Sequence, residues 1–167
     1  EGAAIGIATG YHLATGRIPV VYMQNSGIGN AVNPLLSLVD KEVYNIPMLL
    51  LIGWRGEPGT KDEPQHIKQG KVTIPLLDSM GIKHSILSKE EKLAGEQLSN
   101  ALSYIEQTKE PFAILIQKGT FEEFELPSSE DLPLLLSRES AIKTVASSIS
   151  SEDIIVSTTG MISRELF

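Results

Sequence analysis

Residues 18–36 constrain the fold most strongly, because they pass from a strand pattern to a helix pattern through a glycine-rich turn. The stretch begins as a short apolar run, turns through Gln24-Asn25-Ser26-Gly27-Ile28-Gly29-Asn30, and continues as an apolar helical segment. A strand, a glycine-rich turn and a helix in this order present backbone N–H groups to a ligand at the carboxyl edge of an α/β sheet. This turn is therefore the first candidate for a binding site.

The rest of the chain repeats the same alternation. Apolar runs of strand length follow at 47–52 and 112–116, and a short strand is expected at 82–87. Helical patterns separate these runs, and we expect helices over 1–14, 29–44, 65–80 and 88–107. This order predicts an α/β fold built on a doubly wound parallel sheet with right-handed crossovers.

The first helical pattern carries glycine at positions 2, 6 and 10, which lie on one helical face. Each glycine in a helix interior costs roughly 1 kcal/mol relative to alanine. Three of them on one face therefore predict a close backbone contact with a neighbouring element.

The composition changes after the fourth strand pattern. From residue 118 to 133 the sequence is rich in acidic residues, serine and proline, without a clear period, which predicts a linker. A helix is expected over 137–148 and a strand over 153–157, followed by Thr158-Thr159-Gly160. Because residue 1 is Glu and the chain stops just after this strand and turn, we expect an internal part of a longer protein.

Composition and charge exclude several classes of function. The 167 residues carry 21 acidic and 14 basic side chains, a net charge of −7, with no basic cluster, which argues against nucleic acid and anionic membrane surfaces as partners. No apolar run reaches the roughly 18 residues of a membrane span. The absence of cysteine excludes disulfides, thiolate catalysis and zinc–thiolate sites, and it fits a reducing compartment.

The glycine-rich turn does not complete a nucleotide or hydrolase motif. Gly27 and Gly29 fit a dinucleotide fingerprint only in part, because Val32 replaces the third glycine. Ser26 follows Gln24 by two positions rather than a glycine, so a nucleophile elbow is absent. No P-loop sequence occurs.

The segment after the second strand pattern carries most of the remaining charged candidates. Arg55 and Lys61 form a plausible clamp for a carboxylate, phosphate or phosphonate. Asp62, Glu63 and His66 are metal-ligand residue types, but a solvated loop followed by a helix start is the favoured interpretation.

Five segments in order resemble thiamine-diphosphate-dependent decarboxylases. They are Glu1-Gly2 before a Gly/Ala-rich helix, the turn over 24–30, Gly53-Trp54-Arg55-Gly56-Glu57-Pro58-Gly59, Asp62-Glu63-Pro64-Gln65-His66, and residues 158–167. The resemblance covers essentially the whole chain, and the second to fourth segments are specific. The Gly-Asp-Gly…Asn magnesium motif of that family does not occur in this sequence.

The resemblance implies a domain organisation. Residues 1–117 would form a pyrimidine-binding domain lacking its first strand and helix, residues 118–137 a linker, and residues 138–167 the opening of a diphosphate-binding domain. The implied cofactors are thiamine diphosphate and Mg²⁺, with the magnesium ligands outside this sequence. Because such enzymes clamp the cofactor between two subunits, a homodimer or homotetramer with its active site at the subunit interface is expected.

The resemblance also implies roles around the cofactor. Glu1 matches the acid that hydrogen-bonds N1′ of the aminopyrimidine, and the cofactor's own 4′-imino group can then remove the C2 proton. Asn25, Ser26 and Gly27 match a turn near the centre of the cofactor, where a close backbone approach needs glycine.

Five further residues complete the expected site. Arg55, Gln65 and His66 are assigned to the substrate, and Thr159 and Gly160 match the turn of the diphosphate-binding domain. The implied reaction is cytoplasmic decarboxylation of the 2-oxo acid 3-phosphonopyruvate to phosphonoacetaldehyde and CO₂. The alternatives are decarboxylation of sulfopyruvate, or a non-catalytic pyrimidine-binding subunit of a two-chain decarboxylase.

Overall fold

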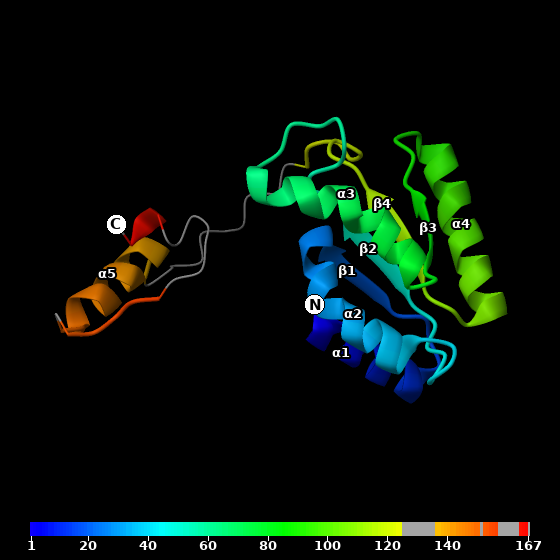
Figure 1. The fold of residues 1–167 in the computed structure, drawn as a ribbon, viewed down its shortest axis with the longest axis horizontal. Helices are drawn as coiled ribbons and strands as arrows, with labels where there is room; N and C mark the ends of the chain where they lie inside the picture. Colours follow the sequence, from blue (N-terminus) through cyan, green and yellow to red (C-terminus); the bar gives the residue numbers. More distant parts are fainter. Residues whose placement is uncertain (125–135, 151, 157–163, 167) are drawn as a thin grey trace. The chain divides into compact units, whose positions relative to one another are not determined.

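The computed structural model describes residues 1–124, 136–150, 152–156 and 164–166. It divides into two compact units, Glu1–Glu122 and Glu123–Phe167 (Figure 1). The elements of the first unit are α1 (Gly2–Thr15), β1 (Val20–Gln24), η1 (Asn25–Gly27), α2 (Ile28–Pro34), η2 (Leu35–Val39), β2 (Leu49–Gly53), α3 (Pro64–Ser79), β3 (Lys83–Ile86), α4 (Glu91–Thr108) and β4 (Phe112–Ile116). The second unit contains α5 (Arg138–Ser148).

The first unit is built on a four-stranded parallel sheet in the order β1-β2-β4-β3. The register pairs Val20 with Leu49, Leu49 with Phe112, and Phe112 with Lys83. The strands therefore start level with one another, and their carboxyl ends meet at one edge. The predicted parallel α/β sheet is confirmed.

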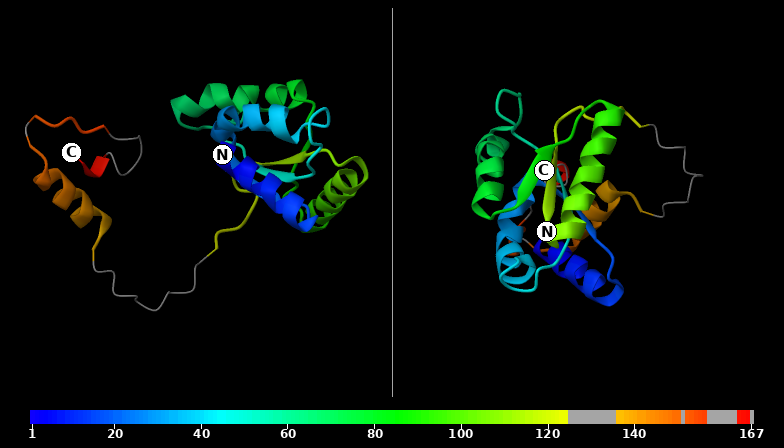
Figure 2. Two further views of the ribbon diagram at one scale, coloured as in Figure 1. Left: turned by 90° about the horizontal axis from the view of Figure 1, so that it is seen from below. Right: turned by 90° about the vertical axis from the view of Figure 1, so that its right-hand side faces the viewer.

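Helices cover both faces of this sheet. Figure 2 shows α2 and α3 on one face and α4 on the opposite face. Neighbouring residues of the central strands point to opposite faces, since Leu50 and Leu115 pack with α2 and α3 while Leu49 and Ile114 pack with α4. This explains why β2 and β4 read as continuous apolar runs rather than alternating ones.

The two cores differ in size. The larger one, which α1 joins beside α2, includes Ile5, Ala8, Val21, Met23, Ile28, Leu35, Leu50, Ile52, Leu77 and Leu115. The smaller one consists of Leu49, Leu87, Ala101, Ile105, Phe112 and Ile114. Burying one such side chain contributes about 1.5–3 kcal/mol, so these clusters fix the positions of the loops that follow the strands.

The helix after β1 differs from the prediction of one helix over 29–44. The structure has a 3₁₀ turn at Asn25–Gly27, a short α2, and a π-helical turn that ends at Val39. Pro34 lies inside the segment and has no N–H to continue the α-helical bonding pattern, which accounts for the change of helix type.

The predicted strand over 153–157 is wrong for its described residues. Residues 153–156 form no strand. Ile154 and Val156 are about nine-tenths exposed, at 89% and 91%, and no strand in the described part of the chain pairs with them. The predicted helix over 137–148 is present as α5, where Ser137 accepts a hydrogen bond from Ser140 N at 3.1 Å.

Candidate active site

Two loops at the carboxyl edge of the sheet bring the predicted residues together. The turn after β1 contains Asn25–Gly27, and the loop after β2 runs from residue 54 to 63 into α3. Because β1 and β2 are adjacent and parallel, both loops leave the sheet at the same edge. Glu1 precedes α1 and lies against the first of these loops.

The Glu1 side chain lies directly over Gly27. A Cβ atom added at Gly27 would overlap Cγ and Cδ of Glu1. Asn30 Nδ2 donates to Glu1 Oε2 at 3.3 Å, and the residue is exposed. The carboxylate is therefore held by close contact with a glycine and by a long hydrogen bond.

The first turn of α1 sits close to α2 because residue 2 is glycine. A Cβ atom at Gly2 would lie 2.9 Å from the carbonyl oxygen of Asn30. The same atom at Gly6 or Gly10 would meet nothing within 4 Å. The close contact predicted for all three glycines is thus confirmed only at Gly2, which brings Glu1 next to the turn.

Asn25 connects the two loops through its buried side chain. Its Nδ2 donates to the Arg55 carbonyl oxygen at 2.8 Å and to Thr73 Oγ1 at 2.9 Å, and its Oδ1 accepts from Arg55 N at 3.0 Å. Ser26 Oγ donates to Gln24 Oε1 at 2.6 Å. The polar side chains of both residues are therefore used within the protein, where they fix the shape of the turn.

Asp62 is the centre of the second loop. Its carboxylate accepts from Arg55 Nε at 2.8 Å, Arg55 Nη2 at 2.5 Å, Gly56 N at 2.7 Å and Glu63 N at 2.8 Å. His66 Nδ1 lies 3.1 Å from Asp62 Oδ1. The paired contacts to Arg55 form a two-pronged ion pair, the geometry that guanidinium and carboxylate groups favour.

These contacts control the charge of Asp62. The Arg55 guanidinium, followed by the Gly56 N–H and the His66 imidazole, holds the pKa of the Asp62 carboxyl well below its usual range. Loss of solvent around the carboxyl acts in the opposite direction and is the smaller effect. Asp62 is therefore a carboxylate at neutral pH.

Two glycines allow the second loop to cross α3 in direct backbone contact. Gly56 has φ +66°, and a Cβ atom there would overlap the His66 carbonyl group. A Cβ atom at Gly70 would overlap the Gly56 carbonyl group and lie 2.8 Å from the Arg55 oxygen. Trp54 is buried, and its Nε1 donates a hydrogen bond to the Gly70 oxygen at 3.0 Å, which adds a second link between the loop and α3.

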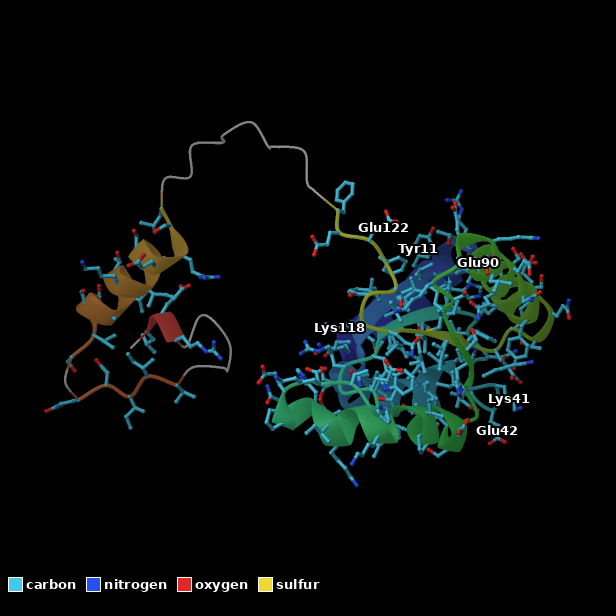
Figure 3. All side chains as sticks on the ribbon, turned by 90° about the horizontal axis from the view of Figure 1, so that it is seen from above. Tyr11, Lys41, Glu42, Glu90, Lys118 and Glu122 are labelled. Carbon is cyan, nitrogen blue, oxygen red and sulfur yellow. The ribbon has the colours of Figure 1, made fainter. Side chains whose placement is uncertain are left out.

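A pocket of about 350 Å³ opens beside this loop at the ends of β2 and β4. It is lined by Gly53, Trp54, Arg55, Thr60, Lys61, Asp62, Ile116, Gln117 and Lys118. Three of these residues, Arg55, Lys61 and Lys118, are cationic, and Lys118 is labelled in Figure 3. Arg55 and Lys61 thus share one pocket, in keeping with a clamp for an anionic group.

The remaining predicted site residues fall into two groups. Gln65 is exposed in the first turn of α3, one residue before His66, whose side chain is 14% exposed. Thr159 and Gly160 lie outside the described residues.

The central role of Asp62 in the loop was not predicted from the sequence. Its spacing of four residues from His66 at a helix start could have suggested the pair.

A larger apolar groove of about 580 Å³ lies between α1 and β1. It is lined by Ala4, Ile7, Ala8, Tyr11, Ile18, Pro19, Val20, Val21 and Tyr22. No acidic or basic side chain lines this groove, and its polar side chains are those of Tyr11 and Tyr22.

In residues 1–124, 136–150, 152–156 and 164–166, no group of three His, Cys, Asp or Glu side chains is arranged to hold a metal ion. Within the same part of the chain, no helix combines the length and apolarity needed to cross a membrane.

Comparison with known proteins identifies related sequences. Residues 1–82 match the family described as thiamine pyrophosphate enzyme, N-terminal TPP binding domain. Phosphonopyruvate decarboxylases of Streptomyces viridochromogenes and Streptomyces hygroscopicus are 29% and 30% identical over all of this chain and 45% of their own length. Sulfopyruvate decarboxylase subunit alpha of Methanocaldococcus jannaschii is 36% identical over 69% of this chain and 65% of its own length. The chain therefore spans about half the length of the two phosphonopyruvate decarboxylases.

Proposed function

We propose that the chain is part of a thiamine pyrophosphate enzyme, whose N-terminal TPP binding domain residues 1–82 match, and that its parent protein decarboxylates 3-phosphonopyruvate to phosphonoacetaldehyde and CO₂. The similarity to phosphonopyruvate decarboxylases over the whole chain supports this substrate. The proposed cofactors are thiamine diphosphate and Mg²⁺. We place the reaction in the cytoplasm, in keeping with the absence of cysteine.

The observation that carries the proposal is the position of Glu1 against Gly27. The pair offers a carboxylate beside a turn without a side chain, and a planar heteroaromatic ring with a basic nitrogen suits both features. Asn25 ties this turn to the loop of Arg55 and Asp62, so the acid and the cationic pocket belong to one edge of the sheet.

The chain's own residues would then hold the cofactor and its protons. Glu1 would share a proton with N1′ of the aminopyrimidine, and the backbone at Gly27 would let the ring approach. When bound, thiamine diphosphate supplies an acceptor for the electrons released with CO₂. Residues 1–117 would act as the pyrimidine-binding domain, residues 118–137 as a linker, and residues 138–167 as the start of the diphosphate-binding domain with Thr159 and Gly160.

The substrate is a 2-oxo acid with a second anionic group. Arg55 and Lys61 would bind the phosphonate or the carboxylate, helped by the third cation of the pocket, Lys118. Gln65 and His66, at the start of α3, would face the reacting carbon. The carbon–carbon bond to the carboxylate breaks, CO₂ leaves, and the carbonyl carbon gains a proton.

Two alternatives remain specific enough to test. The first is sulfopyruvate as the substrate, which differs from phosphonopyruvate by about one charge. The second is a two-chain enzyme in which this chain is a pyrimidine-binding subunit. The similarity to sulfopyruvate decarboxylase subunit alpha favours both alternatives. A Gly-Asp-Gly…Asn segment after residue 167 on the same polypeptide would dismiss the two-chain alternative. In either form we propose at least a dimer with the site between subunits.

The experiment compares CO₂ release from phosphonopyruvate, sulfopyruvate and pyruvate by the intact protein with thiamine diphosphate and Mg²⁺. We expect kcat/KM for phosphonopyruvate to be at least a hundredfold higher, about 2.7 kcal/mol of discrimination. A preference for sulfopyruvate would replace the substrate and keep the chemistry. Release from none of the three would refute the proposed reaction.

A further inference from the structure

We infer that Asp62 is a positioning residue of this site: it fixes the tautomer of His66, so that Nε2 is the free basic nitrogen, and it fixes the guanidinium of Arg55 at the anion pocket. The effect of this positioning on turnover rests on the proposed function. The positions of His66 and Arg55 do not rest on it, because they follow from contacts within the chain.

Asp62 can only be the hydrogen-bond acceptor in its contact with His66. A carboxylate only accepts hydrogen bonds, and the Asp62 oxygen lies 3.1 Å from His66 Nδ1. In neutral imidazole one ring nitrogen carries the proton and the other accepts. The proton must therefore be on Nδ1, and Nε2 must carry the lone pair.

Asp62 itself is held in place by the loop. The Gly56 and Glu63 N–H groups donate to it at 2.7 and 2.8 Å, and the side chain of Asp62 is only 13% exposed. The backbone crossing at Gly70 fixes the loop in turn. His66 is therefore oriented by a group that cannot easily turn away from it.

Asp62 also determines what Arg55 offers to a ligand. The ion pair uses Nε and Nη2 of the guanidinium, while the Arg55 side chain remains 43% exposed in the wall of the pocket. The guanidinium presents its remaining N–H groups from a fixed position. Lys61, which lines the same pocket, adds the further positive charge that an anionic group of the substrate needs once Asp62 neutralises Arg55.

The direct test observes the His66 ring nitrogens by ¹⁵N NMR of the protein without substrate or cofactor. Signals of His66 are identified by their loss in His66→Gln, and spectra are taken near pH 8.5, about two units above the ordinary imidazole pKa of 6.5. We expect a proton on Nδ1 and none on Nε2. A proton on Nε2 in the unmodified protein would overturn the inference without need of any variant.

Variants of the two neighbouring acids sharpen this test. Asp62→Ala removes the acceptor opposite Nδ1 and puts no other in its place, so we expect the proton to move to Nε2. Glu63→Gln is the matched control, because Glu63 is the adjacent exposed acid and only its backbone groups contact Asp62 and His66. An unchanged tautomer in Asp62→Ala, with the fold verified by circular dichroism, would refute the role of Asp62.

Kinetics of the intact protein separate the inference from the proposed function. We expect Asp62→Ala to lower kcat with phosphonopyruvate at least tenfold, and to lower it by a smaller factor in a protein that already carries His66→Gln, where only the effect through Arg55 remains. Additive losses would show that Asp62 does not act through His66. If the tautomer changes as expected but no 2-oxo acid is decarboxylated, the proposed function fails and the placement of His66 stands.

Discussion

The two loops at the carboxyl edge of the sheet are organised in different ways. The loop after β2 is held by a carboxylate with four backbone or guanidinium donors and a histidine, and by two glycines in backbone contact. The turn after β1 positions Glu1 by contact with Gly27 and a hydrogen bond of 3.3 Å from Asn30. We therefore expect the second loop to matter for stability as well as activity, and Glu1 to matter for activity alone.

The largest effect is expected for Glu1→Gln in the intact protein. Loss of a positioned acid typically costs a factor of 10² to 10⁴ in rate, so turnover should fall to near the background. Because Glu1 is exposed, the free energy of unfolding should change by no more than about 0.5 kcal/mol, and cofactor binding should stay nearly unchanged. Steady-state kinetics, denaturant titration and cofactor titration measure the three quantities. Activity close to normal would remove Glu1 from the mechanism.

Gly70→Ala should give the largest loss of stability. The new methyl group would overlap the Gly56 carbonyl group and force the loop away from α3, at a cost of about 1–3 kcal/mol. Gly95→Ala is the matched control, because Gly95 lies in α4 with open space around its Cα and should become about 0.5–1 kcal/mol more stable. Denaturant unfolding of both variants provides the comparison. Equal free energies of unfolding for Gly70→Ala and Gly95→Ala would mean that the backbone contact at Gly70 does not hold the loop.

Gly27→Ala should show whether turnover depends on the position of the Glu1 carboxylate and not only on its presence. The backbone at Gly27 has φ −80°, which alanine adopts freely, so the methyl group acts only by displacing the Glu1 side chain. We expect kcat to fall roughly tenfold or more, as for other small misplacements of catalytic groups, with little loss of stability. Gly29→Ala, which meets nothing within 4 Å, should leave kcat unchanged. Equal kinetics for the two variants would contradict the placement of Glu1.

The smallest effect concerns acid stability and the Asp62 carboxylate. Its pKa is depressed in the folded protein, chiefly by Arg55, so deprotonation favours the folded state. This contribution is complete above the unfolded pKa of about 3.9 and is lost as the pH falls below it. The stability advantage of the unmodified protein over Asp62→Asn should therefore be constant between about pH 5 and 7 and shrink below pH 4. Denaturant midpoints measure it, and an advantage that does not depend on pH would exclude the ion pair as its source.

Much of the fold follows from the sequence, because its patterns are local. The apolar runs at 47–52 and 112–116 each became a strand within two residues of the predicted ends. The segment after Gly27 did not become the predicted long helix, since Pro34 changes the hydrogen-bond pattern inside it. The strand expected at 153–157 had the right composition, but a strand also needs a neighbour, which local sequence cannot supply.

The sequence predicts candidate site residues but not the contacts between them. Glu1, Gly27 and Arg55 were identified from segments that resemble a family, and the structure brings the loops that carry them to one edge. The contacts of Asn25 with Arg55 and Thr73, 30 and 48 residues away, depend on the parallel pairing of β1 with β2 and on the packing of α3. Asp62 was overlooked as a centre because its donors include backbone N–H groups, which leave no trace in residue types.

The most direct test of the account measures exchange of the C2 proton of thiamine diphosphate bound to the intact protein. Exchange into deuterated water is followed by NMR after rapid acid quenching, in the unmodified protein and in Glu1→Gln. We predict exchange at least a hundredfold slower in the variant, because Glu1 is proposed to support removal of this proton through N1′. Equal rates in the two proteins, with equal cofactor occupancy, would contradict the assignment of this edge of the sheet as the active site.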